Sequence, residues 1–252
     1  GFVNLFYVIF HPSSWLDWSD KTALGHFIYY GASKEFFFVI FDVFVVLSVV
    51  GAFYRKFLWA IVRGFEAFAN TVGRFFAWAS LFMVLQQIMI VFLQRIFKVS
   101  EIAISPFGFA FTRDLSWYGE ELKFYNAMIV CLAASYTFVQ GGHVRVDLFY
   151  AGMRHRAKRV VDMIGSLFFI IPFMTIIWMF GWFFMWRHLI VPNPSASDQL
   201  DRLLLKSRAL RWNIEFIGPS PNGFTAYFLF KILLVALAGM VFLHGCAFFW
   251  RS

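Results

Sequence analysis

Charged residues and cysteines are scarce in this chain of 252 residues. Only 14% of the residues are charged, against about 25% in soluble domains. The two cysteines, Cys131 and Cys246, both lie in apolar runs, where cysteine behaves as a small hydrophobic residue. Two such cysteines supply neither a disulfide framework nor a metal-ligand set.

Two kinds of catalytic pattern are also missing. The chain has no Gly-x-x-x-x-Gly-Lys-Ser/Thr loop, which excludes a P-loop nucleotide-binding site. No expected helix presents the paired histidines or carboxylates that haem, di-iron or hydrolytic centres use. We therefore expect no enzyme activity, no cofactor and no metal.

Apolar and aromatic residues dominate instead. Hydrophobic residues make up 61% and aromatic residues 22% of the chain, with 37 phenylalanines, as in an integral membrane protein. The net charge is +8, but the basic residues lie between apolar runs rather than on one polar face. An anionic lipid surface is therefore the expected partner, and nucleic acid is not.

Five apolar runs approach or exceed the roughly 20 residues that a helix needs to cross the hydrocarbon core. They cover residues 35–53, 75–95, 119–140, 162–190 and 224–250. The sequence thus predicts an all-α integral membrane protein with about five transmembrane helices, plus short interfacial amphipathic helices. We expect the latter at 57–73 and 195–212, each lying flat on the membrane, with Ser195 and Asp198 forming a capping box. Residues 1–10 are apolar but too short to cross.

The positions of lysine and arginine predict the orientation. The linker 54–74 carries Arg55, Lys56, Arg63 and Arg74, and the linker 141–161 carries Arg145, Arg154, Arg156, Lys158 and Arg159. Short loops rich in these residues stay in the cytoplasm. We therefore expect a cytoplasmic C-terminus and, because five spans are predicted, an N-terminus on the opposite side of the membrane.

Small and aromatic residues predict how the helices pack. Ala127, Cys131 and Ser135 recur every four residues in the third run, and the last run has Ala238 and Gly239 near its middle. Small residues let helix backbones approach closely in lipid, so these two helices are predicted to pack most tightly. Trp178, Trp182 and Trp186 should share one helix face, with Trp186 in the interfacial aromatic belt and Trp178 packing deeper against lipid or a partner helix.

The polar residues within the apolar runs that could have a functional role are Asp42, Gln86, Gln87 and His244. An ionisable residue within a membrane is costly and is by default a functional hypothesis. Asp42 stands alone, however, and a proton relay needs more than one such group, so a structural contact is the favoured reading. The two glutamines and the histidine are expected to bond between helices.

Two polar groups border the third run. Glu120 and Glu121 open it on the expected periplasmic side, where acids favour a helix N-terminus; contact with a partner is the alternative. His143, Arg145 and Asp147 follow its other end, without a nucleophile or a second carboxylate nearby. We expect them to hold a cytoplasmic turn, with Arg145 facing lipid phosphate or a partner loop.

Several short stretches together resemble the small permease subunit of tripartite ATP-independent periplasmic (TRAP) transporters. They are Gln94-Arg95-Ile96-Phe97, Trp117 with Glu120-Glu121-Leu122, His143-Val144-Arg145-Val146-Asp147, Asp162-Met163-Ile164-Gly165, and Glu215 with Asn222-Gly223. The turn at 143–147 is the most specific of these. The resemblance implies a four-helix domain over 57–252, preceded by an N-terminal extension, 1–56, with an extra transmembrane helix.

The resemblance also implies a function and partners. The chain would be a non-catalytic scaffold subunit of an ion-coupled secondary transporter for an organic acid or a similar polar solute. It would partner a large permease subunit, which carries the solute and ion sites, and a periplasmic solute-binding protein. The alternative is an accessory transmembrane subunit that borders another large membrane complex, photosynthetic or respiratory, with no transport role.

Overall fold

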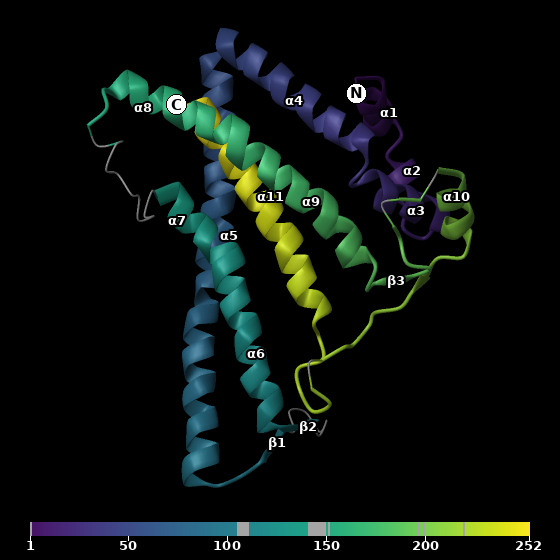
Figure 1. The fold of residues 1–252 in the computed structure, drawn as a ribbon, viewed down its shortest axis with the longest axis vertical. Coiled ribbons are helices and arrows are strands. Elements are labelled where there is room, and N and C mark those ends of the chain that lie inside the picture. Colours follow the sequence, from purple (N-terminus) through teal and green to yellow (C-terminus); the bar gives the residue numbers. More distant parts are fainter. Residues whose placement is uncertain are drawn as a thin grey trace.

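The computed structural model describes residues 2–104, 111–140, 150, 152–195, 197–198, 200–218 and 220–252. Within these residues, five helices are long and apolar enough to cross a membrane, which confirms the prediction (Figure 1). The spans are α4 (Lys34–Phe53), α5 (Arg55–Val91) with η1 (Phe92–Ile96), α6 (Leu115–Met128) with η3 (Ile129–Ala133) and α7 (Ala134–Gln140), α8 (His155–Gly165) with η4 (Ser166–Ile170) and α9 (Ile171–Trp186), and α11 (Phe228–Arg251). The η segments are single π-helical turns, which interrupt the hydrogen-bond pattern without ending the helix.

Short elements join and flank the spans. They are α1 (Phe2–Phe10), α2 (Ser13–Leu16), α3 (Lys21–Tyr30), α10 (Leu200–Arg208), and the strands β1 (Glu101–Ile104), β2 (Phe111–Asp114), β3 (Ile190–Val191) and β4 (Arg211–Trp212). β1 pairs antiparallel with β2, and β3 with β4. These two small two-stranded sheets leave the fold class all-α, as predicted.

Local capping explains where two of the N-terminal helices begin. The Asp20 side chain accepts a hydrogen bond from Thr22 N at 2.9 Å and starts α3. Ser33 Oγ accepts from Phe36 N at 3.1 Å and starts α4. Side-chain oxygens at this position replace the missing intrahelical acceptors of the first turn.

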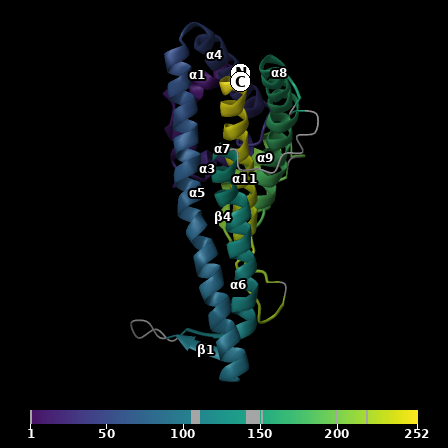
Figure 2. The same cartoon turned by 90° about the vertical axis from the view of Figure 1, so that its left-hand side faces the viewer.

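The prediction of a separate interfacial helix at 57–73 is wrong. Residues 55–91 form one continuous helix, α5, which stands upright through the length of the molecule (Figures 1 and 2). Its 37 residues rise about 55 Å, well beyond the roughly 30 Å hydrocarbon core. Arg63, Glu66 and Arg74 all lie within α5, so these charged residues do not end the helix.

Other boundaries also differ from the prediction. The third span begins at Leu115 instead of 119, and the fourth runs from His155 to Trp186 instead of 162–190. The helix expected at 195–212 is only α10, Leu200–Arg208. Its capping box does not form, because Ser195 Oγ bonds Ser197 Oγ and the Asp198 carboxylate pairs with Lys206.

The last span lies at the centre of the described bundle. In its most apolar stretch 44% of the residues are buried, against 6–12% in the other four spans. Three close approaches bring α11 against the fourth span: Val235 near Gly181, Trp178 near Gly239 and Ile170 near Gly245. α11 therefore packs most closely on α9 rather than on the third span. The third span has α5 as its close neighbour, where Tyr136 lies over Gly73.

The tryptophan row holds the N-terminal extension on the bundle. Trp178 and Trp182 lie on one face of α9 with ring centroids 5.3 Å apart. Trp182 Nε1 donates to Ile28 O at 2.8 Å, and Trp178 Nε1 donates to Gly31 O at 3.0 Å. These carbonyls belong to the end of α3, where the helix itself supplies no donors. Trp186 is 4% exposed, so its predicted place in an exposed aromatic belt is wrong.

The same extension also contacts α10. Gly25 of α3 lies so close to Ser207 of α10 that an added Cβ would be 2.5 Å from the serine Cβ. Leu24 and Ile28 of α3 share a buried cluster with Trp182 and Leu210. Burial and the nearby negative charge of Asp198 raise the pKa of Tyr29 to about 12, so this phenol keeps its proton at physiological pH. The extension thus adds a packed layer rather than a loose tail.

We predict that Trp182→Phe destabilises the docked extension by about 1–3 kcal/mol, because the Ile28 carbonyl loses its donor in a buried place. The change should lower the thermal midpoint of the purified protein in detergent and speed proteolysis between α3 and α4. Trp78→Phe is the control, since Trp78 is 61% exposed on α5. Equal behaviour of the two variants would contradict the role given to the Trp182 indole.

Candidate functional site

The polar residues that the sequence singled out are distributed over both ends and the middle of the bundle. The most highly connected group lies at the start of α6, close to the β1–β2 hairpin and to the loop that precedes α11. The opposite end carries the densest basic cluster.

Glu120 ties α6 to the loop before α11. Its carboxylate accepts a hydrogen bond from Phe224 N at 2.8 Å and another from Ser220 Oγ at 3.2 Å. Gly223 lies directly against this carboxylate and leaves no room for a Cβ. Because α6 begins at Leu115, Glu120 lies beyond its first turn, so the predicted capping of this helix by Glu120 is wrong. Instead, the Glu120 carboxylate accepts a hydrogen bond from Phe224 N, 104 residues further along the chain.

Glu121 joins α6 to α5. Gln86 Nε2 donates to Glu121 Oε2 at 3.0 Å and to Tyr118 O at 3.1 Å. Tyr125 Oη donates to the other carboxylate oxygen at 3.4 Å. A glutamine amide in one span thus binds a carboxylate and a carbonyl of the next. Together the two glutamates connect three segments of the fold by hydrogen bonds, which is a positioning role rather than a proton path.

The other intramembrane polar residues do not join this group. Gln87 is exposed on α5. His244 is half-buried on α11, where its ring stacks on Phe248 and lies near Phe138. Asp42 is half-buried on α4, and within the described chain no ion pair or hydrogen bond is found for it. These three residues lie on different helices. Neither Gln87 nor His244 supplies the second carboxylate that a proton relay through Asp42 would need.

The predicted cytoplasmic turn with His143, Arg145 and Asp147 lies outside the described residues. Its flank is described. Tyr150 Oη donates to Asp162 Oδ2 at 2.7 Å, and Lys158 Nζ lies 5.2 Å from the centroid of the Tyr150 ring. These contacts fasten the segment after the turn to the first half of the fourth span. The sequence offered no signal for this pairing beyond the family-like Asp162-Met163-Ile164-Gly165 stretch.

Basic residues gather at one end of the bundle. The α4–α5 turn, α8 and the C-terminus lie together at this end in both views (Figures 1 and 2). The exposed basic residues are Arg55, Lys56, Arg154, Arg156, Arg159 and Arg251. Arg251 Nη1 also pairs with Glu66 Oε1 at 3.2 Å, which ties α11 to α5. This end therefore presents a positive surface around the helix ends.

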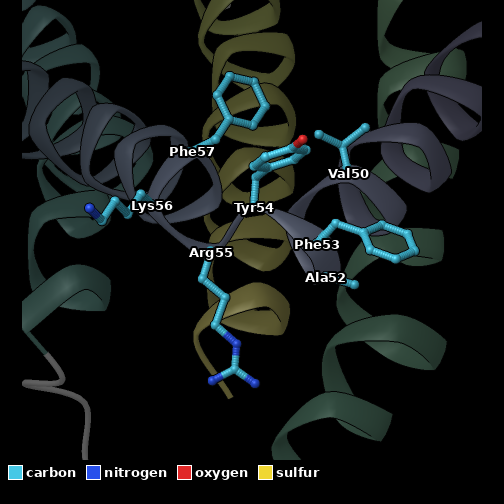
Figure 3. A pocket seen from close by; sticks show the side chains of 7 residues that line it. All are labelled: Val50, Ala52, Phe53, Tyr54, Arg55, Lys56 and Phe57. Atoms are coloured by element: carbon cyan, nitrogen blue, oxygen red, sulfur yellow. The ribbon is translucent and has the colours of Figure 1, made fainter.

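The α4–α5 turn itself forms an open hollow. It is lined by Val50 and by residues 52–57. Figure 3 shows the Arg55 and Lys56 side chains pointing away from each other and from the Tyr54 ring. The cations do not converge on one point, so the hollow does not form a closed anion site. Nor does the described part of the chain contain a group of three His, Cys, Asp or Glu side chains suited to a metal ion.

We predict that Glu120→Gln loosens the loop before α11, because a charge-assisted hydrogen bond to Phe224 N becomes a weaker neutral one. Deuterium uptake of peptides covering 218–226 should rise, with about 1–2 kcal/mol less protection at Phe224. Glu101→Gln, an exposed carboxylate on β1, is the control. Unchanged uptake in the Glu120 variant would show that this loop is held by other contacts.

A comparison with protein families identifies the central part of the chain. Residues 107–197 match the model for tripartite ATP-independent periplasmic transporters, DctQ component. Comparisons with curated proteins and with solved structures gave no significant match. The matched stretch includes Glu120, Glu121 and the 143–147 turn, and it confirms the resemblance seen in the sequence. Residues 107–197 are thus similar to the DctQ components, the small permease subunits of TRAP transporters.

Proposed function

We propose that this chain is the non-catalytic scaffold subunit of an ion-coupled TRAP transporter for an organic acid or a similar polar solute. In this proposal it partners a large permease subunit, which carries the solute and ion sites, and a periplasmic solute-binding protein. The family match supports the transporter class. The exposed apolar surface of the spans supports the scaffold role.

That surface is the observation on which the proposal depends. In the most apolar stretches of the first four spans, only 6–12% of the residues are buried within the chain. Large side chains stand out from α5, η4 and α9, including Phe75 at 70%, Phe169 at 71% and Phe180 at 71% exposure. Helices in lipid associate through packing and hydrogen bonds rather than through the hydrophobic effect. Broad bulky faces of this kind suit lateral contact with a larger membrane subunit and with lipid.

The arrangement of polar groups argues against a solute path through this chain. Secondary transporters bind their solutes where paired helices are broken near the midplane. The described spans continue through their π-helical turns, and both glutamates of α6 are engaged in structural hydrogen bonds. We infer that solute passes through the large subunit while this chain supports its stationary part.

We further propose that the basic end is cytoplasmic. Lysine and arginine near span ends favour the cytoplasmic side and its anionic lipids. From the five spans, we propose a cytoplasmic C-terminus and a periplasmic N-terminus in a bacterial inner-membrane protein. Within the chain, we propose a family-like domain over 57–252 and an extension over 1–56. His143, Arg145 and Asp147 are proposed to hold the cytoplasmic turn and to contact lipid or the large subunit.

We predict that mild solubilisation from native membranes recovers this chain together with a large permease subunit, and that the isolated chain in liposomes takes up no solute. Arg145→Glu should reduce recovery of the large subunit several-fold, because it places an acid at an anionic surface. Arg202→Glu, an exposed charge reversal on α10, is the control. Mass spectrometry and uptake assays are the measurements.

Two results would contradict this proposal. Uptake by the isolated chain would show that it forms a path of its own. Consistent recovery with a photosynthetic or respiratory complex, and with no permease, would instead support an accessory role in that complex.

We predict that Asp42→Asn leaves solute uptake by the reconstituted complex within about twofold of the wild type. A single carboxylate with no ion pair or hydrogen bond among the described residues makes a poor relay, although intramembrane acids are often functional. Uptake is compared at equal amounts of assembled complex. Loss of ion-coupled uptake in a normally assembled Asp42→Asn complex would show that Asp42 serves the coupling reaction.

A further inference from the structure

An apolar groove of about 490 Å³ lies between α4 and the fourth span, with α11 as its floor. Its walls run from Phe36 to Phe44 on α4 and from Leu167 to Met179 on η4 and α9, and its floor includes Gly239. Its lining carries two polar groups, and both are already bonded: the Thr175 hydroxyl donates to Ile171 O at 2.8 Å, and the Trp178 indole donates to Gly31 O at 3.0 Å. The groove thus offers no unsatisfied polar group to a ligand.

The shape of the groove limits what can occupy it. Its walls extend for about 12 Å along α4 and about 18 Å along α9, at the 1.5 Å rise of a helix residue. The groove is therefore long, and its lining is apolar along both walls. An extended hydrocarbon chain suits such a groove.

Contacts at its far end make the groove a blind slot. Phe44 packs on Trp250 and Phe249 of α11, with ring centroids 5.5 and 5.4 Å apart. Trp250 Nε1 donates to Ser48 Oγ at 2.9 Å, which bonds α4 to α11 just beyond the slot. The slot is therefore confined to the half of α4 that begins at Lys34, and its length matches one leaflet of the hydrocarbon core, about 15 Å.

The groove opens sideways to the bilayer rather than to water. The rims of its opening include Phe37 and Phe41, which are 38% and 52% exposed, and both belong to a helix with the composition of a membrane span. Lys34, exposed at the start of α4, supplies a cation at the open half for a lipid phosphate. An empty apolar slot would forfeit the dispersion contacts of its lining.

We propose that this groove binds one acyl chain of a phospholipid from the leaflet at the amino-terminal end of α4. The bound chain fills the space between α4 and α9 and so joins the N-terminal extension to the part of the chain that matches the family. This site involves α4, which lies outside the matched residues 107–197. It does not depend on the transport proposal, because the isolated chain already forms it.

The test uses the full chain reconstituted in phosphatidylethanolamine–phosphatidylglycerol vesicles with a phosphatidylcholine that carries a diazirine near the end of one acyl chain. After photolysis, mass spectrometry should find labelling of 36–44 and 167–179 at least fivefold above that of the exposed face around Trp78 on α5. Ile40→Trp and, separately, Met174→Trp should reduce the groove labelling several-fold by filling it. Phe38→Trp is the matched control, since Phe38 is 54% exposed on the outer face of α4 and does not line the groove.

Equal labelling of the groove and of the α5 face would overturn the proposal, as would labelling that both filling variants leave unchanged. A third measurement covers the possibility that these variants misfold. A benzoylphenylalanine at Phe41, in cells, should crosslink to lipid. Crosslinking chiefly to another membrane protein would overturn the proposal and assign the groove to a protein partner.

Discussion

A helix in the hydrocarbon core has no water to satisfy its polar groups, so every such group needs a partner inside the protein. This constraint governs the contacts that hold the described bundle together. Gln86 meets Glu121 across two spans, and Ser48 meets Trp250. The indoles of Trp178 and Trp182 meet the open carbonyls at the end of α3. Each bond joins segments that are distant in sequence, and together they define which helices are neighbours.

Around these bonds, packing is uneven. α11 is enclosed by α9, α5 and the third span, while the outer faces of the other spans carry exposed phenylalanines. A chain that uses its small residues around one central helix leaves bulky faces to its surroundings. That division suits a subunit that is rigid inside and broad outside, and it agrees with a small permease component that supports a larger one. The blind groove beside α4 adds a place where lipid itself completes the packing.

Much of the architecture could be predicted from the sequence, because length and apolar composition determine which segments can cross a membrane. The five spans were predicted in this way, and short motifs carried the resemblance to TRAP small subunits. The boundaries were less predictable. Charged residues at 63, 66 and 74 suggested a separate interfacial helix, yet a helix can continue past the hydrocarbon, since backbone hydrogen bonds do not depend on the depth of the side chains. Trp186 was predicted to lie in the interfacial aromatic belt. It is buried instead, because α3 and β4 pack against it, and the sequence around Trp186 does not indicate where those two elements lie.

The sequence by itself determined the class of this protein, its membrane-spanning segments and its basic and acidic ends, because these follow from composition and charge along the chain. Only the tertiary structure decided the partners of the polar side chains. It directed Glu120 to the backbone of Phe224, Glu121 to Gln86, and the α9 indoles to the N-terminal extension. The physical reason is that such bonds join residues from 32 to more than 150 positions apart, and helical periodicity carries no information on which distant segment lies opposite.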